Sequence, residues 1–295
     1  MKNENYIIID CSSIIYASFY AYGSLSLEGK NTGVIFGFLT KILKLAKDLD
    51  SNRVFYCFDH GESKREEIYP QYKEKRKKKR LKLNEQEQYE YNLMKEQAID
   101  LHDNALPKLG FRNIFQQSGY ESDDLMAVLV NIFKEQNKKI IMVTSDNDMY
   151  QLLEFCDIFN PSILKFFTKK NFMDKYKVHP SQWSICKSIG GCESDEVIGI
   201  VGAADPKKET SKALKYVLGD LKKGKIFERI ESEEGQKIIE RNLKLVKLPY
   251  EGTREIILRR DKVTKQKLLD VLNKYKFKSF LEPDKFREWE RVFLK

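Results

Sequence analysis

The sequence predicts an α/β fold with a mostly parallel central sheet and helices on both faces. Short, largely apolar runs at residues 6–9, 53–58 and 139–144 are typical of strands that are buried on both sides. Segments with helical periodicity separate these runs, and strands that alternate with helices favour a parallel sheet. A carboxylate follows each run, so acidic groups are expected at one edge of that sheet.

The first part of the chain alternates predicted strands and helices in order. The strand at 6–9 leads into a helix at 14–22, which Ser12 and Ser13 could cap. A second helix, at 33–48, carries apolar residues at helical spacing. The elements expected after the strand at 53–58 are a helix at 84–104, a strand at 110–115, a helix at 123–135, a strand at 139–144, a short helix at 148–154 and a strand at 156–160.

The pattern changes after about residue 180, where strand signals fade and helical segments dominate. We therefore divide the chain into an α/β part at 1–180 and a helical part at 181–295. A glycine-punctuated acidic turn at 190–202 begins the second part, and several lysines that include Lys212 follow it. Glycines let a backbone approach a phosphate closely, although a simple helix–helix corner would show the same pattern.

Composition limits the class of ligand and the cellular compartment. The 295 residues carry a formal net charge of +9 although acidic side chains cluster within them, which favours a polyanionic partner. The sequence contains no apolar run of about 18 residues, so no membrane span is expected. The five cysteines are odd in number and lack the spacing of a zinc site, which indicates reduced thiols in the cytoplasm.

The acidic residues gather where ligand sites form in parallel sheets, at the carboxyl ends of strands. Those that follow predicted strands are Asp10, Asp59, Asp146 and Asp148, and those at the start of a helix are Glu121, Asp123 and Asp124. Taken alone, each of the two clusters favours helix capping over metal binding. Together they would repel one another unless a cation holds them. Oxygen donors without histidine indicate Mg²⁺ or Mn²⁺.

The segment at 69–83 is strongly basic and has few apolar side chains that could pack against a sheet. Such a run is often only a solvated face or a localisation signal. Because this one lies between Asp59 and the acidic helix start, we interpret it as a binding segment for single-stranded nucleic acid. Tyr69 and Tyr72 could stack on bases there. We expect residues 70–84 to be mobile without a ligand.

The spaced motifs resemble the phage-type 5′-nucleases of the flap endonuclease and 5′-3′ exonuclease family, which includes the phage RNase H enzymes. The resemblance rests on Ile9-Asp10, Phe58-Asp59, Tyr72-Lys73 with Arg76, Glu121-Ser122-Asp123-Asp124, Thr144-Ser145-Asp146-Asn147-Asp148, and Ser194-Asp195-Glu196-Val197 leading to Gly199-Ile200-Val201-Gly202. It extends to about Pro249, and the order and spacing of the motifs make the combination specific.

This resemblance implies a PIN-like nuclease domain at 1–180 with a helical arch at about 69–104. It also implies a DNA-binding region at 181–295 with a helix-two-turn-helix element. The residues that would surround two divalent ions, Mg²⁺ or Mn²⁺, are Asp10, Asp59, Glu121, Asp123, Asp124, Asp146, Asp148 and Asp195. Lys73 and Arg76 would act at the scissile phosphate and Tyr72 would stack on the substrate. Lys77 and Lys78 of the arch would bind DNA, as would Lys212 and the turn from Gly199 to Gly202, the latter in some family members through K⁺.

The expected function is therefore a monomeric, structure-specific 5′-nuclease of replication and repair. Its substrate would be DNA with a 5′ end or flap, or an RNA–DNA hybrid, and its catalytic residues would be Lys73, Arg76, Asp146 and Asp148. The alternatives are a nucleic-acid-binding protein with an impaired metal site and a PIN-type ribonuclease.

Two features depart from the family pattern. Cys192 occupies the position of a usual metal-binding aspartate, and Glu193 could substitute for it. The glycine turn is also followed by a longer insertion, at 203–209, before the next helix.

Overall fold

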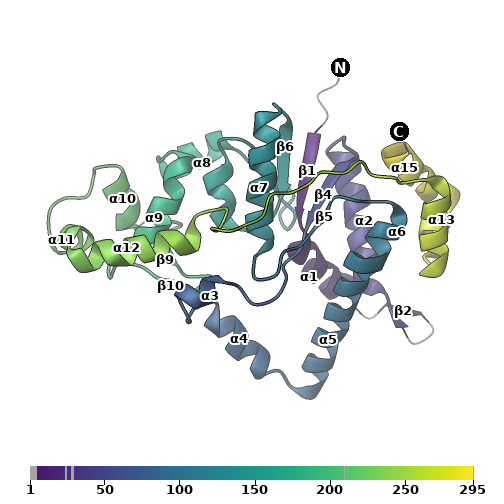
Figure 1. Ribbon diagram of the computed structural model, residues 1–295, viewed down its shortest axis with the longest axis horizontal. Helices are drawn as coiled ribbons and strands as arrows, with labels where there is room; N and C mark the ends of the chain where they lie inside the picture. Colours follow the sequence, from purple (N-terminus) through teal and green to yellow (C-terminus); the bar gives the residue numbers. More distant parts are fainter. Residues whose placement is uncertain (1–4, 24, 28–29, 209, 295) are drawn as a thin grey trace.

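A six-stranded sheet forms the centre of the computed structural model, which describes residues 5–23, 25–27, 30–208 and 210–294 (Figure 1). The strand order is β5-β4-β1-β6-β7-β8. The strands are β1 (Asn5–Asp10), β4 (Arg53–Cys57), β5 (Ile114–Phe115), β6 (Lys139–Val143), β7 (Asp157–Asn160) and β8 (Lys165–Phe167). Among the described strands of this sheet, the β7–β8 pair alone is antiparallel, so the prediction of a mostly parallel sheet is confirmed.

One predicted strand is shorter than expected, and several short strands were not predicted. The strand expected at 110–115 is reduced to β5, because the first residues of this segment close α6: Gly110 has a φ of +104°, and the Phe111 N–H bonds back to the Leu106 carbonyl. Strand β8 was not predicted, since its few residues carry no clear alternating pattern. A two-residue pair, β2 (Ser26–Leu27) with β3 (Lys30–Asn31), was also missed for its shortness.

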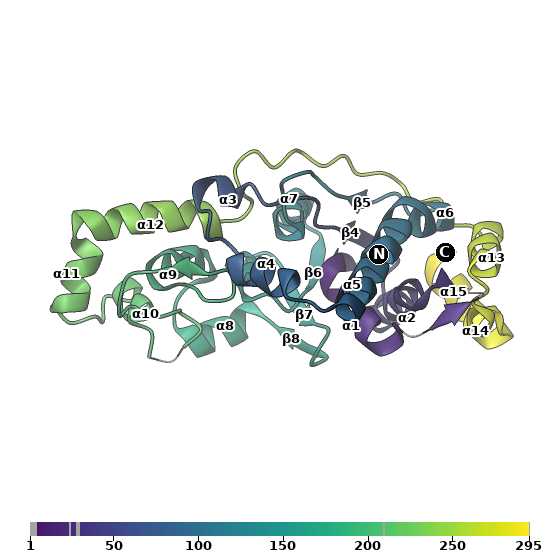
Figure 2. The ribbon, with the colours of Figure 1, turned by 90° about the horizontal axis from the view of Figure 1, so that it is seen from below.

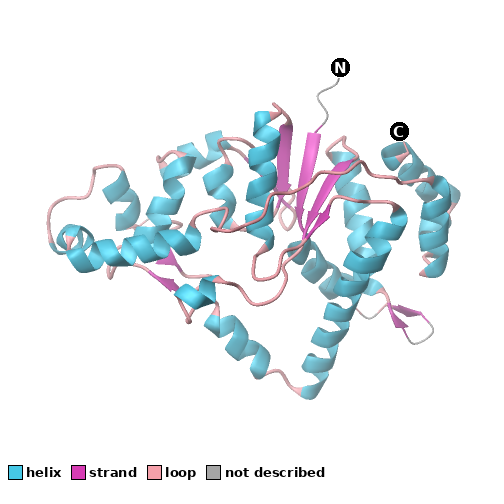
Figure 3. Ribbon diagram, viewed as in Figure 1, coloured by secondary structure: helices cyan, strands magenta, loops and turns pink. Residues whose placement is uncertain are grey.

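Helices cover both faces of the sheet, as Figure 3 shows by its colours. Successive side chains of a strand point to opposite faces, and accordingly Ile7 and Ile9 enter one core while Ile8 enters the other. The first core is closed by α1 (Cys11–Tyr22) and α2 (Gly33–Asp48). The second is closed by α7 (Ser122–Glu135), α8 (Lys169–Tyr176) and α9 (Trp183–Gly190).

The last three helices return to the first core rather than joining the helical part of the molecule. They are α13 (Lys265–Lys274), α14 (Lys278–Leu281) and α15 (Pro283–Phe293). Trp289 is fully buried in that core, with its ring 5.8 Å from that of Phe280 and 5.3 Å from that of Phe293. An irregular connection at 247–264 leads to them across the sheet edge (Figure 2). The boundary at residue 180 stays a prediction, but residues 265–293 pack with the sheet.

The basic segment forms part of a helical arch. After α3 (Arg65–Ile68), the helices α4 (Glu74–Leu81) and α5 (Glu85–Asp100) run away from the sheet and meet at a corner (Figure 1). Asn84 caps α5 in a reciprocal capping box with Glu87. A π-helical turn (Leu101–Ala105) and α6 (Leu106–Leu109) return the chain to the core. Helix α4 has no buried residue, so packing does little to hold it in place.

The region after α9 consists of turns and further helices. The short strands β9 (Gly191–Cys192) and β10 (Val197–Ile198) pair with each other, and α10 (Lys212–Val217), α11 (Lys225–Glu231) and α12 (Glu233–Val246) follow. Helices α9 and α10, with the turns between them, form the expected helix-two-turn-helix. Among the described residues, no helix combines the length and the apolar character that a membrane crossing needs. All five cysteines are buried and free.

Candidate active site

The carboxylates at the ends of β1 and β6 and at the start of α7 come together. Asp10 ends β1, and its side chain accepts a hydrogen bond from the backbone N–H of Ser13, so it caps α1 in place of the predicted Ser12 or Ser13. It also accepts hydrogen bonds from Ser122 Oγ at 3.4 Å and Thr144 Oγ1 at 3.3 Å. These bonds tie the start of α7 and the end of β6 to the end of β1.

Asp59 lies at the rim of the same group. Its Oδ1 accepts a hydrogen bond from the backbone N–H of Ser122 at 2.7 Å, and its Oδ2 accepts one from Ser12 Oγ. Its charge contributes to raising the pKa of Asp10. The structure therefore brings Asp59 beside Asp10, as the sequence predicts.

The electrostatics of this group fit a divalent cation. Burial, and then the charge of Asp59, raise the pKa of Asp10 to about 6. Burial, and then the charges of Asp148 and Asp195, raise the pKa of Asp146 to about 7. The pKa of Asp123 is also well above its usual value, through burial and then through Asp146 and Asp10. The structure shows no ion pair between Asp10, Asp123 or Asp146 and another described residue, so a bound cation would offset their repulsion.

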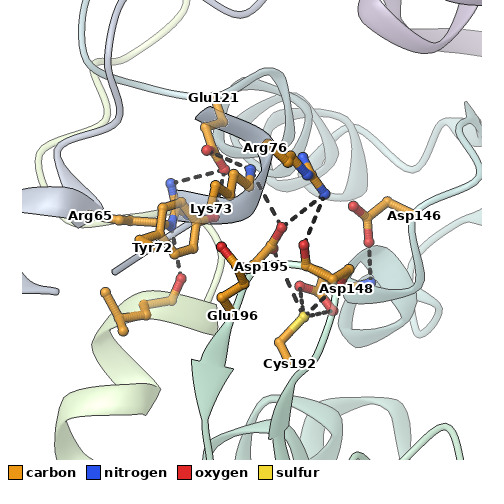
Figure 4. A network of polar contacts seen from close by, with 12 residues as sticks. Arg65, Tyr72, Lys73, Arg76, Glu121, Asp146, Asp148, Cys192, Asp195 and Glu196 are labelled. Carbon is orange, nitrogen blue, oxygen red and sulfur yellow. Dashed lines mark hydrogen bonds and ion pairs between the residues drawn. The ribbon is translucent and has the colours of Figure 1, made fainter. Parts of the chain in front are cut away.

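A second group lies beside the first and contains Asp148, Cys192 and Asp195 (Figure 4). One ligand atom from each residue lies within 4.8 Å of the others. The Cys192 Sγ atom is 3.4 Å from Asp148 Oδ2 and 3.9 Å from Asp195 Oδ2. Both carboxylates are nearly buried, so water screens their charges little, and together they also suit a divalent ion.

The base of the arch supplies cations to both groups. Lys73 precedes α4, and its Nζ lies 2.6 Å from Glu121 Oε1 and 3.8 Å from Asp195 Oδ1. Arg76 lies one turn further on, with a guanidinium nitrogen 3.1 Å from Asp195 Oδ1. Burial alone would lower the pKa of Lys73, but the charges of Asp195 and Glu121 raise it above its usual value. Lys73 is therefore positively charged where the sequence predicts a phosphate-binding cation.

Asp124 does not join the carboxylates that the sequence grouped with it. Its two oxygens accept hydrogen bonds of 2.7 and 2.8 Å from the guanidinium of Arg65, and both side chains are buried. The backbone N–H of Tyr250 donates to it as well. The prediction of Asp124 as a metal ligand is thus corrected. Arg65 was missed because a single arginine among mixed charges carries no recognisable pattern.

Tyr72 is also placed differently from the prediction. Its side chain is only 3% exposed, and its ring packs in a cluster with Tyr69, Val197 and Leu245. Its hydroxyl donates a hydrogen bond of 3.0 Å to Glu121 Oε2. In this structure Tyr72 therefore holds Glu121 and offers no open face for a base, and Tyr69 is covered too.

Glu193 lies outside the site. Its side chain is 62% exposed and pairs with Lys208 at 3.0 Å, so the prediction that it substitutes for the missing aspartate is wrong. The position is filled by Cys192 itself, which is fully buried. Neighbouring residues of an extended segment point in opposite directions, which explains why one faces the carboxylates and the other faces solvent.

Lys187 is a buried cation of the site that sequence reasoning missed. Its Nζ lies 2.8 Å from Asp148 Oδ1 and 3.7 Å from Asp205 Oδ1, and its side chain is 2% exposed. Burial opposes the charge, but Asp148, Cys192 and Asp205 raise the pKa of Lys187 above its usual value. Asp205 belongs to the insertion at 203–209, so this insertion contributes a counter-ion to the site.

The predicted DNA-binding residues lie on α4 of the arch and in the region after β10. Lys77 pairs with Glu66, and Lys78 pairs with Glu74 at 2.8 Å along α4. Lys212 begins α10. The remaining two, Gly199 and Gly202, shape the turn after β10. A side chain at Gly199 would collide with the backbone of residues 189–191, where α9 ends and β9 begins, and Gly202 has a φ of +89°.

Comparisons with known proteins agree with this geometry. Residues 5–177 match the family described as 5′-3′ exonuclease, N-terminal resolvase-like domain. The chain is 32% identical over 246 residues to a 5′-3′ exonuclease of Aquifex aeolicus, a match that covers 82% of this chain and 80% of that protein. It is 28% identical over 293 residues to DNA polymerase I of Caldicellulosiruptor bescii, covering 94% of this chain but only 33% of that protein.

A solved structure shares the fold. The flap endonuclease of bacteriophage T5, solved with DNA and metal ions, superposes with a TM-score of 0.69 at 20% sequence identity. The superposition covers 83% of this chain and 90% of that one. At this identity the likeness concerns the fold alone.

Proposed function

The chain belongs to the 5′-3′ exonuclease family, and we propose that it is a structure-specific 5′-nuclease that hydrolyses phosphodiester bonds near 5′ ends or flaps of DNA. One observation carries this proposal: buried carboxylates from two strand ends and a helix start gather beside Glu121 and Asp195, which pair with Lys73 and Arg76 at the base of a basic arch. Carboxylates that bind metal beside cations that bind phosphate are the groups that phosphodiester hydrolysis needs.

We assign the two acidic groups to two divalent ions. Asp10, Asp123 and Asp146, with Asp59 at the rim, suit Mg²⁺ or Mn²⁺, because they offer only oxygen. Asp148 and Asp195 would hold the second ion, with Asp146 between the two groups. When bound, such ions supply an activated water and stabilise the leaving oxygen. The T5 enzyme with the same fold was solved with metal ions, which supports this assignment.

The residues of the arch base would bind the scissile phosphate. Lys73 and Arg76 now neutralise Glu121 and Asp195. In the complex with DNA, these two side chains would turn from the carboxylates toward the non-bridging oxygens of the phosphate. There they would stabilise the charge that develops in the transition state. Tyr72 and Arg65 contribute by fixing Glu121, which in turn positions Lys73.

The remaining basic residues would hold the rest of the substrate. Lys77 and Lys78 on α4 would contact the single-stranded 5′ end, because that helix is exposed and charged along its length. The glycine turn from Gly199 to Gly202 and Lys212 would hold the duplex, with K⁺ as a candidate ion at the turn. The relatives named above are one 5′-3′ exonuclease and one DNA polymerase, so DNA is the preferred substrate and an RNA–DNA hybrid the alternative. We expect the protein to act as a monomer.

The test is cleavage of a 5′-labelled flap duplex, compared with a nicked duplex, an RNA–DNA hybrid and single-stranded RNA, each with Mg²⁺ and with excess chelator. We expect Mg²⁺-dependent cleavage near the base of the flap. Binding of the flap without cleavage under any metal would instead favour a nucleic-acid-binding protein with an impaired site, for which Cys192 is the supporting feature. Preference for single-stranded RNA would favour a PIN-type ribonuclease.

A further inference from the structure

The second acidic group contains a sulfur atom where the family resemblance leads one to expect oxygen. Cys192 is fully buried, and its Sγ lies between the carboxylates of Asp148 and Asp195. The thiol is therefore one of the three atoms that face the position of the second ion. Whatever ion binds there must accept sulfur in its coordination sphere or leave the thiol unused.

The two carboxylates divide their oxygens between cations and this sulfur. Asp148 directs Oδ1 to Lys187 at 2.8 Å, and Asp195 directs Oδ1 to Arg76 at 3.1 Å. The other oxygens, Oδ2 of each residue, lie 3.4 and 3.9 Å from Cys192 Sγ. Lys187 Nζ also lies 3.4 Å from Cys192 Sγ, so this one cation partly compensates the charge on the side that faces the sulfur.

The spacing suits an ion that takes both sulfur and oxygen. Around a tetrahedral Zn²⁺, bond lengths of about 2.3 Å to sulfur and about 2.1 Å to oxygen place those two atoms about 3.6 Å apart. The observed separations of 3.4 and 3.9 Å bracket this value. Mg²⁺ instead requires a near-octahedral shell of oxygens and gains little from a sulfur.

We propose that Asp148, Cys192 and Asp195 form a mixed thiolate–carboxylate site that selects a thiophilic divalent ion of the Zn²⁺ and Cd²⁺ type over Mg²⁺. The role of this site in a two-metal nuclease rests on the proposed function. The site itself is defined by the three residues alone. Binding converts the thiol to a thiolate and releases its proton to solvent. The oxygen-only group at Asp10 and Asp123 keeps its preference for Mg²⁺, so the two positions would differ in metal.

Lys187 limits how the ion can bind. Its ammonium holds Asp148 Oδ1 and is itself held by Asp205. Asp148 would therefore bind the ion through Oδ2 alone, and Lys187 would offset the negative charge that remains after two carboxylates and a thiolate meet one divalent ion. A site with three protein ligands leaves room for Asp146 or water as the fourth.

The experiment is a titration of the intact protein with Cd²⁺ in a Mg²⁺ buffer, followed by the ultraviolet charge-transfer absorption of a cadmium–thiolate bond. We expect one equivalent of this absorption in the wild type. Cys192→Ser and Cys192→Asp should abolish this absorption. Both should also weaken Cd²⁺ binding by at least roughly 10–100-fold, because loss of even a hydrogen-bond partner of a metal ligand has an effect of that size. Cys156→Ser is the matched control, because Cys156 is buried and free but belongs to the second core, and its absorption should equal that of the wild type.

Cadmium NMR of the wild type gives a second measurement that requires no variant, since sulfur ligation shifts the resonance far from that of an all-oxygen site. Absence of the absorption and of this shift, their persistence in Cys192→Ser, or displacement of Cd²⁺ by an equal concentration of Mg²⁺ would each overturn the proposal. Both readouts are made without DNA. A protein that binds Cd²⁺ through Cys192 but cleaves no flap would refute the nuclease assignment and leave the metal site standing.

Discussion

Arg65 on α3 donates two hydrogen bonds to Asp124 on α7, and a third from its Nε to the backbone carbonyl of Leu245 on α12. This buried pair therefore joins the arch, the sheet layer and the helical part of the molecule. It also explains why Asp124 differs from Asp123. Consecutive residues of a helix point about 100° apart, so one faces the strand ends and the other faces Arg65.

The first prediction concerns the stability that this pair provides. Arg65→Ala should lower the free energy of unfolding by about 3–5 kcal/mol, because it leaves the buried charge of Asp124 without a partner. Urea denaturation followed by circular dichroism measures the change. Lys170→Ala, which removes one partner of the exposed pair with Asp174, is the control and should leave the midpoint unchanged. Equal midpoints for Arg65→Ala and the wild type would contradict the structural role.

The second prediction concerns the dependence of stability on pH without metal. The pKa of Asp146 is about 7 in the folded protein against 3.8 for the ordinary residue, so the folded state binds more protons between these values. Its contribution to stability is therefore greatest below pH 4 and falls as the pH rises toward 7. Asp146→Asn removes this pH-dependent contribution. In excess chelator, the stability of the variant relative to the wild type should therefore increase as the pH rises from 5 to 8.

The free energies of unfolding of the wild type and of Asp146→Asn at pH 5 and pH 8 measure this difference. Asp284→Asn, which changes an exposed side chain, serves as the control. Saturating Mg²⁺ should remove or reverse the advantage of Asp146→Asn, because only the wild-type carboxylate binds the ion. A variant that gains nothing at pH 8 in chelator would show that neither burial nor the neighbouring carboxylates destabilise the charge of Asp146.

The third prediction concerns catalysis at the same residue. Asp146→Asn should abolish Mg²⁺-dependent or Mn²⁺-dependent cleavage and spare DNA binding, since the arch cations are unchanged. Cleavage assays with binding measured in parallel on the same flap duplex separate the two effects. Full wild-type activity in excess chelator would disprove the requirement for a divalent ion.

Much of this site followed from the sequence, and the exceptions have a common physical cause. Asp10, Asp59 and Asp146 could be placed because strand order brings strand ends together whatever the side-chain details. The roles of Asp124 and Glu193 depended on the direction in which a side chain points. Arg65, Lys187 and Asp205 depended on long-range partners, which no local pattern records. The packing of residues 265–293 with the sheet was likewise invisible, because amphipathic helices do not reveal which surface they cover.

The fourth prediction distinguishes Lys73 at the base of the arch from the exposed lysines of α4. Lys73→Ala should slow single-turnover cleavage more than it weakens binding, because Lys73 lies among the carboxylates. Lys77→Ala and Lys78→Ala should mainly weaken binding. Each should also reduce the slope of log affinity against log salt by about 0.7–0.9 for a lost phosphate contact. Lys75→Ala, whose side chain is 85% exposed, is the matched control for Lys73. An unchanged single-turnover rate in Lys73→Ala would exclude it from the chemical step.

The last prediction concerns the Mg²⁺ requirement of the second site. Because the buried thiol of Cys192 is a poor partner for Mg²⁺, cleavage should need a higher Mg²⁺ concentration than an all-oxygen site would. Cys192→Asp restores a carboxylate between Asp148 and Asp195 and should lower the Mg²⁺ concentration for half-maximal cleavage. Glu193→Gln should leave the curve unchanged, because that side chain is exposed and pairs with Lys208.

Titration of the cleavage rate with Mg²⁺ for the wild type and both variants decides between the roles of these neighbours. If the curve of Glu193→Gln moves to higher Mg²⁺, then Glu193 must turn inward during the reaction, against the arrangement seen here. If Cys192→Asp and the wild type superimpose, the second position does not limit Mg²⁺-dependent cleavage. A leftward shift for Cys192→Asp alone would show that the single sulfur atom sets the Mg²⁺ requirement of the enzyme.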